Sequence, residues 1–324
     1  MYKLVSLFCG CGGSDLGALG GFYFNKKEYK KHPCELVYAC DIDLKAIDSH
    51  KLNFNDANVA CADICDVKAQ EIPDCDIITG GFPCQSFSTV NPTKDPFDDR
   101  ANLYKQMARI VSDKKPGVFV AENVKGMMTL HKGEIFKQIL NAFAEVGYKT
   151  FHALLNAADY GIPQKRERVF IVGIRNDIFE KKGDFSFPRK THQGNWVPLS
   201  VAVPKLAIEE KKYYFSERAV QGMKNAKNNM KRGLAQDLSK PCLTVTSHLA
   251  KVSLNSRDPV LLVDPEKELY RRFTPKEAAR IQSFPDDFAF AGSESTAYKQ
   301  IGNAIPPVLF WHIIDAVVKY LKED

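Results

Sequence analysis

Three kinds of reactive side chain follow one another along the chain, each in a short and distinctive context. Cys84 lies in a Gly-Gly-Phe-Pro-Cys-Gln stretch, Glu122 begins Glu-Asn-Val, and Arg166 and Arg168 belong to Gln-Lys-Arg-Glu-Arg. A thiol nucleophile, a carboxyl that exchanges a proton and a guanidinium that holds a carbonyl oxygen are the groups needed to add to a pyrimidine ring. Each group alone is weak evidence, and only their joint order indicates this chemistry.

Each of these residues also has a plain structural interpretation. A cysteine is most often a small buried hydrophobe, but Cys84 follows a proline-fixed loop and precedes polar residues, which favours exposure. Glu122 directly follows a predicted strand, where a structural carboxylate is the more common finding. Arg166 and Arg168 are two residues apart and would share one side of a strand, or form a surface ion pair with Glu167.

Short apolar segments alternate with helical ones through the first half of the chain. We expect buried strands at residues 4–8, 36–39, 76–79, 118–121, 151–155 and 169–174, and helices at 44–54, 103–111 and 135–146. Strands that alternate with helices in this way form a mostly parallel sheet with helices on both faces. The predicted fold class is therefore α/β, with a doubly wound, mostly parallel sheet.

The alternation stops after Arg175, which predicts a smaller inserted domain of short strands and loops. Prolines recur through residues 181–270 and would interrupt any long helix there. A helix restarts after Thr274, which forms a capping-box pattern with Glu277, and a last helix at 306–321 carries one apolar face. The expected organisation is a main catalytic and cofactor-binding domain at 1–180, an inserted domain at 181–270 and a return segment at 271–324 that completes the main domain.

A glycine-rich turn follows the first predicted strand, at the position where ligands bind in such sheets. Its residues are Phe8, Gly10, Gly12 and Gly13, and glycines there let the backbone approach a nucleoside closely. Asp41 ends the second strand and is placed to bind ribose hydroxyls, and Asp63 ends the next apolar piece, although both could be surface acids. Asp15 stands where a dinucleotide fingerprint needs its third glycine, which weakens a nicotinamide-dependent oxidoreductase as an alternative.

The composition describes an ordinary globular protein with one basic segment. Of 324 residues, 44% are hydrophobic and 26% are charged, and the formal net charge is +6. Residues 181–232 hold twelve Lys and Arg against four acids, so this segment carries +8 and the rest of the chain sums to −2. Such a segment indicates a polyanionic partner, because phosphate contacts dominate nucleic-acid affinity, or alternatively a solvated lysine-rich face.

The cysteines and the first residues suggest a cytoplasmic location. The apolar run at residues 1–8 is too short for a signal peptide or a membrane span, so we expect no membrane association. Nine cysteines, an odd number, do not form the framework of a small secreted domain. The closest pairs, Cys9 with Cys11 and Cys61 with Cys65, lack the spacing of a zinc module, so no metal site is expected.

Taken together, the motifs resemble those of the cytosine-5 DNA methyltransferases of the bacterial modification-methylase type. Six blocks in the family's order carry the resemblance, at residues 8–13, 81–85, 122–124, 164–168, 272–277 and 302–304. The resemblance covers nearly the whole chain. It implies a class I methyltransferase, Rossmann-like fold, S-adenosylmethionine as the methyl donor, and duplex DNA as the substrate.

The resemblance also implies a role for each motif residue. Cys84 would attack carbon 6 of a flipped-out cytosine, Glu122 would hydrogen-bond ring nitrogen 3 and the exocyclic amine, and Arg168 would hold the carbonyl oxygen. Arg166 lies in the same block as Arg168 and is also expected to be a catalytic residue. The expected cofactor contacts are Phe8, Gly10, Gly12, Gly13, Asp41, Ile42, Asp63, Ile64, Pro83, Leu103, Asn303 and Ala304. Among them Asp41 would bind the ribose, Ile42 and Ile64 would sandwich the adenine, Asp63 would contact its amine and Asn303 would close the methionine end.

Two positions depart from the pattern of many relatives, which carry a small residue at the place of Cys9 and a glutamate at that of Asp41. Residues 181–270 fit the family's target-recognition domain, and residues 243–246 resemble its short threonine-containing core.

Two further hypotheses compete with DNA methylation. One is the RNA-directed branch of the family, which carries a Cys-Phe-Thr element that is matched here only by Arg272-Phe273-Thr274. The other is a DNA-binding relative without turnover, against which the complete set of Cys84, Glu122 and Arg168 speaks. The expected partners are double-stranded DNA and a cognate restriction endonuclease, and the chain is expected to act as a monomer.

Overall fold

The computed structural model describes residues 1–54, 58–83, 103–225, 235–251 and 259–322. Within them, seven strands form one sheet in the order β5-β4-β1-β6-β7-β10-β8. Their bounds are β1 (Tyr2–Leu7), β4 (Cys34–Asp41), β5 (Asn58–Cys61), β6 (Ile77–Gly80), β7 (Val118–Val124), β8 (Tyr148–Asn156) and β10 (Glu167–Arg175). The first five strands of that order pair in parallel, whereas β10 runs antiparallel to both β7 and β8. The predicted mostly parallel α/β sheet is confirmed.

Helices cover both faces of this sheet because successive strand residues point to opposite sides. In β7, Val118 and Val120 join a core beneath α1 (Gly13–Leu19), α2 (Leu44–Asn53) and α9 (Pro307–Lys322), and Phe119 joins the opposite core under α3 (Leu103–Lys114) and α4 (Glu134–Glu145). The expected helices at 44–54, 103–111, 135–146 and 306–321 correspond to α2, α3, α4 and α9. The doubly wound arrangement is therefore also confirmed.

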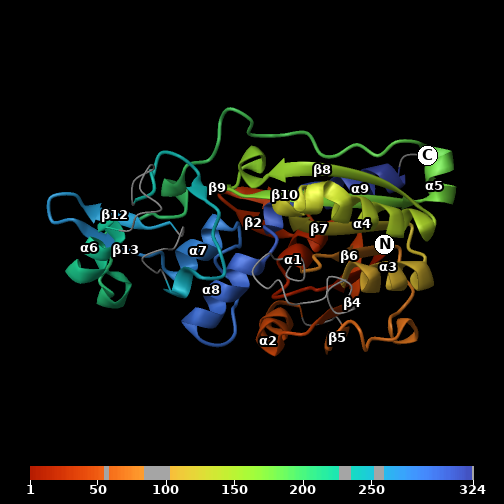
Figure 1. The fold of residues 1–324 in the computed structure, drawn as a ribbon, viewed down its shortest axis with the longest axis horizontal. Coiled ribbons are helices and arrows are strands. Elements are labelled where there is room, and N and C mark those ends of the chain that lie inside the picture. The colour runs from red at the N-terminus through yellow and green to blue at the C-terminus, as the bar shows by residue number, and fades with distance from the viewer. Residues whose placement is uncertain (55–57, 84–102, 226–234, 252–258, 323–324) are drawn as a thin grey trace.

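The chain leaves the sheet after β10 and α5 (Asn176–Lys182) and returns through α7 (Pro275–Ile281) and α8 (Glu294–Asn303). Between them lie short elements: α6 (Glu217–Asn225), β11 (Cys242–Leu243), β12 (Leu261–Asp264) and β13 (Leu269–Arg271). Figure 1 shows α6, β12 and β13 at one end of the molecule, with α7 and α8 between them and the sheet. Two further hairpin strands, β2 (Phe22–Phe24) and β3 (Lys27–Tyr29), follow α1, and β9 (Gln164–Lys165) precedes β10.

A third hydrophobic core joins the inserted segment to the returning helices. Val245 and Leu261 from the insertion pack with Phe273, Ala278 and Ile301 from the return segment. The helix α7 begins as predicted, because Thr274 accepts from the Glu277 amide while the Glu277 carboxylate accepts from Thr274 N. The boundaries at residues 180 and 270 stay a prediction, since this core contains residues from both sides of residue 270.

The stretch Glu294–Lys322 is long and apolar enough to cross a membrane by composition, the one such stretch in the described residues. It is broken between α8 and α9, and 72% of its most apolar window is buried inside the protein. Core helices of globular proteins show the same combination, so this stretch is no indication of a membrane span.

The buried Arg271 should contribute strongly to stability. Its guanidinium is fully buried and donates to both carboxylate oxygens of Glu277, at 2.7 and 2.8 Å. Because Arg271→Met would leave that carboxylate buried without its partner, we expect a loss of about 3–5 kcal/mol in the free energy of unfolding, measured in urea. Lys137→Met breaks only the exposed pair with Glu134 and should cost less than about 1 kcal/mol. Equal losses in the two variants would contradict this assignment.

Candidate active site

The centre of the candidate site is an ion pair between neighbouring antiparallel strands. Glu122 on β7 lies opposite Phe170 on β10, so Arg168, two residues before Phe170, is its diagonal neighbour on the same face. Arg168 Nε lies 2.9 Å from Glu122 Oε1, and the two side chains are only 13% and 12% exposed. The strand register thus brings together two of the predicted catalytic residues.

Burial tunes the proton affinity of the Glu122 carboxyl. Desolvation raises its pKa above the ordinary value, and the positive charges of Arg168 and Arg166 partly offset this rise. A carboxyl with a raised pKa is better able to hold a proton near neutral pH. The site therefore contains a group suited to hydrogen-bond a ring nitrogen, next to a fixed positive charge.

The loop that leads to Cys84 passes directly beside this pair. A Cβ atom built on Gly81 would lie 3.3 Å from Glu122 Oε2. The buried Asn123 donates through Nδ2 to the Phe82 carbonyl at 2.9 Å and so fixes the loop to β7. Pro83 is exposed, and Cys84 lies outside the described residues. Sequence reasoning missed the role of Asn123, although it is the second residue of the Glu-Asn-Val motif.

Arg166 is directed away from the Glu122–Arg168 pair. It lies in the break between β9 and β10, is 2% exposed, and donates to the carbonyls of Val245, Gly302 and Ala304 at 3.0, 2.9 and 3.1 Å. The spacing of two suggests one shared face for both arginines. Of these two arginines, Arg168 alone makes an ion pair with Glu122.

The glycine turn after β1 has the conformation expected of a ligand cradle. Phe8, Gly10 and Gly12 have φ values of 55°, 54° and 94°, in the left-handed region that favours glycine. A Cβ built on Gly10 would meet no atom within 4 Å, so this backbone borders open space. Gly13 faces the other way, because its Cβ would lie 3.2 Å from Ala304 Cβ. The first and last of the predicted cofactor blocks therefore adjoin.

Asp41 anchors this turn to the end of β4. Its two carboxylate oxygens accept from Gly10 N and Asp43 N, both at 2.8 Å. Burial raises the pKa of Asp41, and these backbone donors counteract the rise. The neighbouring Ile42 is 69% exposed, which is unusual for a large apolar side chain. This exposed side chain, beside the glycine turn, is available to pack against a flat apolar ligand.

The other predicted cofactor residues lie on adjoining loops and helix ends. Asp63 Oδ1 accepts from Cys65 N at 2.9 Å, which orders the turn after β5, and Ile64 is buried in the core under α3. Leu103 begins α3 and is half-buried. Asn303 is exposed at the end of α8.

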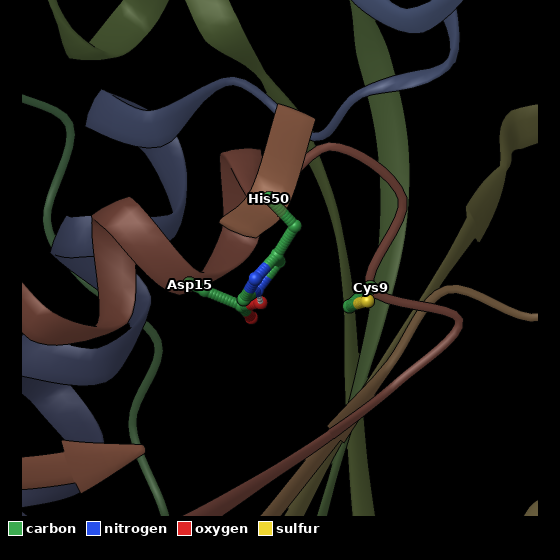
Figure 2. A group of neighbouring side chains, drawn as sticks. All are labelled: Cys9, Asp15 and His50. Atoms are coloured by element: carbon green, nitrogen blue, oxygen red, sulfur yellow. Dashed lines mark hydrogen bonds and ion pairs between the residues drawn. The ribbon is translucent and has the colours of Figure 1, made fainter. Parts of the chain in front are cut away.

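Three buried side chains behind the turn, Cys9, Asp15 and His50, place potential ligand atoms within 4.8 Å of one another (Figure 2). His50 Nε2 lies 2.7 Å from Asp15 Oδ2, and Ser6 Oγ donates to Asp15 Oδ1 at 2.5 Å. His50 Nδ1 has no hydrogen-bond partner among the described residues. Desolvation raises the pKa of the Cys9 thiol well above its ordinary value, which disfavours the thiolate that metals bind. This cluster supports the turn through hydrogen bonds, and the absence of a metal site stays a prediction.

Comparison with known proteins identifies the class to which this fold and site belong. The family model described as C-5 cytosine-specific DNA methylase matches residues 2–319, so the chain belongs to that family. It is 35% identical over 327 residues to the type II methyltransferase M1.ScrFI of Lactococcus lactis subsp. cremoris, covering 100% of this chain and 79% of the relative. It is 36% identical over 337 residues to M.NgoFVII of Neisseria gonorrhoeae, covering 94% of this chain and 83% of the relative.

Solved structures share the fold over their full length. A protein described as a DNA modification methyltransferase encoded within an E. coli prophage superposes with a TM-score of 0.75 at 24% identity, and both chains are covered completely. The S. pombe Dnmt2 methyltransferase superposes with a TM-score of 0.74 at 18% identity, again with full coverage. The chain is therefore a DNA (cytosine-5-)-methyltransferase of the type II modification kind, with a class I methyltransferase fold.

Gly10 and Gly12 both have a left-handed backbone conformation, so they provide a matched test of how the turn is packed. A Cβ on Gly12 would lie 2.3 Å from Phe54 Cε2, whereas one on Gly10 meets open space. We expect Gly12→Ala to cost about 3 kcal/mol of unfolding free energy, from overpacking and backbone strain, and Gly10→Ala about 1 kcal/mol, from strain alone. Urea unfolding measures both. A Gly12→Ala variant as stable as Gly10→Ala would show that the loop is not packed against Phe54.

Proposed function

We propose that this chain transfers the methyl group of S-adenosylmethionine to carbon 5 of a cytosine extruded from duplex DNA. The observation that carries the proposal is the buried Glu122–Arg168 pair, which borders the loop leading to Cys84. A carboxyl with a raised pKa beside a guanidinium matches one edge of cytosine, where ring nitrogen 3 and the carbonyl oxygen are adjacent.

The proposed reaction begins with addition to the ring. The Cys84 thiolate forms a bond to carbon 6, and the electron pair of the 5,6 double bond shifts toward carbon 5 and, through the conjugated bond between carbon 4 and nitrogen 3, toward nitrogen 3. Glu122 hydrogen-bonds ring nitrogen 3 and the exocyclic amine, and Arg168 donates to the carbonyl oxygen, so the developing negative charge meets fixed donors. Carbon 5 would then be nucleophilic, and bound S-adenosylmethionine would supply the methyl group and leave as the neutral thioether S-adenosylhomocysteine. Loss of the carbon 5 proton to a base expels the Cys84 thiolate and restores the aromatic ring.

The target base must leave the helix for this chemistry. In a duplex, stacked neighbours cover both ring faces, so a thiol cannot approach carbon 6. A base rotated into the site would lie between the 81–83 loop and the ends of β7 and β10. Its pairing edge would then exchange hydrogen bonds with the opposite guanine for those with Glu122 and Arg168.

The glycine turn and its neighbours would hold S-adenosylmethionine, which supplies an activated methyl group when bound. Asp41 already accepts two backbone N–H groups, and a carboxylate retains lone pairs for ribose hydroxyls. The exposed Ile42 would cover one face of the adenine and Ile64 the other, while Asp63 would accept from its amine. Gly10, beside open space, lets the methionine part approach the backbone. Phe8, Pro83, Leu103, Asn303 and Ala304 complete the proposed contacts.

The remaining proposals concern partners and location. Residues 181–232, with their net charge of +8, would contact DNA phosphates around the target site. The relatives named type II methyltransferases support a cognate restriction endonuclease that acts on the same sequence. We propose that the enzyme acts as a monomer in the cytoplasm.

Bisulfite sequencing of DNA from a methylation-deficient host that expresses the chain tests the proposal and maps the target. We expect one short sequence to be protected by 5-methylcytosine. Cys84→Ser should abolish the protection. Glu122→Gln should reduce the methylation rate by about 100-fold or more, because an amide cannot exchange a proton with ring nitrogen 3 as a carboxyl can. Lys137→Met, far from the site on α4, is the matched control and should methylate like the wild type.

Incorporation of a labelled methyl group shows whether the enzyme acts on DNA or on RNA. Incorporation into duplex DNA but not into bulk transfer RNA supports the proposal. Exclusive labelling of transfer RNA, or full activity of Cys84→Ser, would contradict it.

A further inference from the structure

A network of buried polar side chains connects residues 245–247, here called the recognition segment, to the last predicted cofactor block at residues 302–304. Gln164, Arg166 and Gln282 have almost no exposed surface, and each makes hydrogen bonds to backbone atoms of one or both of two distant segments. One segment contains Val245, and the other is residues 301–304. Burying a polar side chain costs free energy unless its polar groups form hydrogen bonds. We therefore expect these side chains to hold the two segments in place.

Arg166 is the centre of this network. One terminal nitrogen, Nη1, donates to the Val245 carbonyl at 3.0 Å. The other, Nη2, donates to the carbonyls of Gly302 and Ala304 at 2.9 and 3.1 Å. A single rigid guanidinium therefore fixes the distance between the recognition segment and the residues on either side of Asn303.

The two glutamines extend the connection. Gln164 accepts from Val245 N at 2.8 Å through Oε1 and donates through Nε2 to Gln282 Oε1. Gln282 donates in turn to the carbonyls of Ile301 and Ala304, at 2.8 and 2.9 Å. Both segments are thus held from two sides, and neither can shift without breaking several buried hydrogen bonds.

Backbone packing leaves no slack between the segments. A Cβ atom built on Gly302 would lie 2.2 Å from the carbonyl carbon of Thr246 and 2.3 Å from Ser247 N. Displacement of the 245–247 backbone toward α8 would therefore push Gly302 directly. The next residue along the chain, Asn303, is a proposed cofactor contact.

We propose that Arg166 is a positioning residue that couples DNA engagement by the 245–247 segment to S-adenosylmethionine binding at Asn303 and Ala304. This inference rests on the proposed function and concerns the regulation of the same site. Because one guanidinium holds both segments, a ligand that orders one segment also orders the other. DNA should therefore raise the affinity for S-adenosylmethionine, and S-adenosylmethionine should raise the affinity for DNA by the same factor. Arg168 faces the base, and Arg166 acts only through the segments that it holds.

Calorimetric binding of S-adenosylhomocysteine, with and without DNA, measures the coupling. The DNA is a duplex carrying the sequence mapped by bisulfite sequencing, with its cytosine unmethylated. For the wild type we expect the duplex to raise S-adenosylhomocysteine affinity at least about fivefold, the lower end of ordinary coupling. In Arg166→Lys, whose single ammonium cannot span three carbonyls, the factor should fall to about one, while binding without DNA weakens less.

Arg271→Lys is the matched control, since Arg271 is also buried and donates to the insertion carbonyls of Lys205 and Leu206, and among the described residues it has no hydrogen bond to residues 301–304. It should lose stability and keep the wild-type coupling factor. Equal coupling in Arg166→Lys and the wild type, or equal loss in both arginine variants, would overturn the inference. A wild type that binds no S-adenosylhomocysteine would overturn the proposed function and the inference together.

Hydrogen exchange of the wild type gives a test that does not depend on a folded variant. Val245 N–H donates to Gln164 Oε1, so its exchange reports opening of the network. S-adenosylhomocysteine alone, without DNA, should slow exchange in residues 242–249 as well as in the glycine turn. Slowing in the turn with no change in 242–249 would contradict the coupling.

Discussion

The register between β7 and β10 is the constraint on which the site depends. Antiparallel pairing sets Glu122 opposite Phe170 and makes Arg168 its diagonal neighbour, so a carboxylate and a guanidinium meet where these two strands end. A slip of one residue would turn Arg168 to the other face and leave Glu122 buried alone, with a still higher pKa. The apolar residues of β10, which fill both cores, hold this register.

Positive charge and burial act in opposite directions on the same carboxyl. Desolvation favours protonated Glu122 and the nearby arginines favour its ionised form, and the net result is a raised pKa. A base that accepts from Glu122 and from Arg168 would satisfy both groups and exclude the remaining water. The loop at 81–83, fixed through Asn123, brings the nucleophile block to the same carboxyl.

The sequence predicted six of the seven sheet strands because they contain short apolar runs, and it missed the edge strand β5 (Asn58–Cys61), none of whose residues is fully buried. It predicted α9 because Ile313, Ile314 and Val317 repeat at helical spacing on one face. The diagonal pairing of Glu122 with Arg168 depends on register, which motif order alone cannot supply. The destination of Arg166 was not predictable either, because the strand breaks at that residue and its partners lie 79 to 138 residues away in the chain. The α6 helix in an insertion expected to hold strands and loops shows the same limit of local patterns.

The central claim is that the sulfur of Cys84 bonds to carbon 6 of a base gripped by Glu122 and Arg168. Incubation with S-adenosylmethionine and a duplex containing 5-fluorocytosine at the target position tests it most directly. Because fluorine replaces the hydrogen of carbon 5, no proton can be removed there, elimination is blocked and the adduct persists. Mass spectrometry should then find the oligonucleotide attached to the peptide containing Cys84, and no attachment in Cys84→Ser. Methylation of the ordinary duplex without any trapped adduct, or attachment at another residue, would contradict the mechanism.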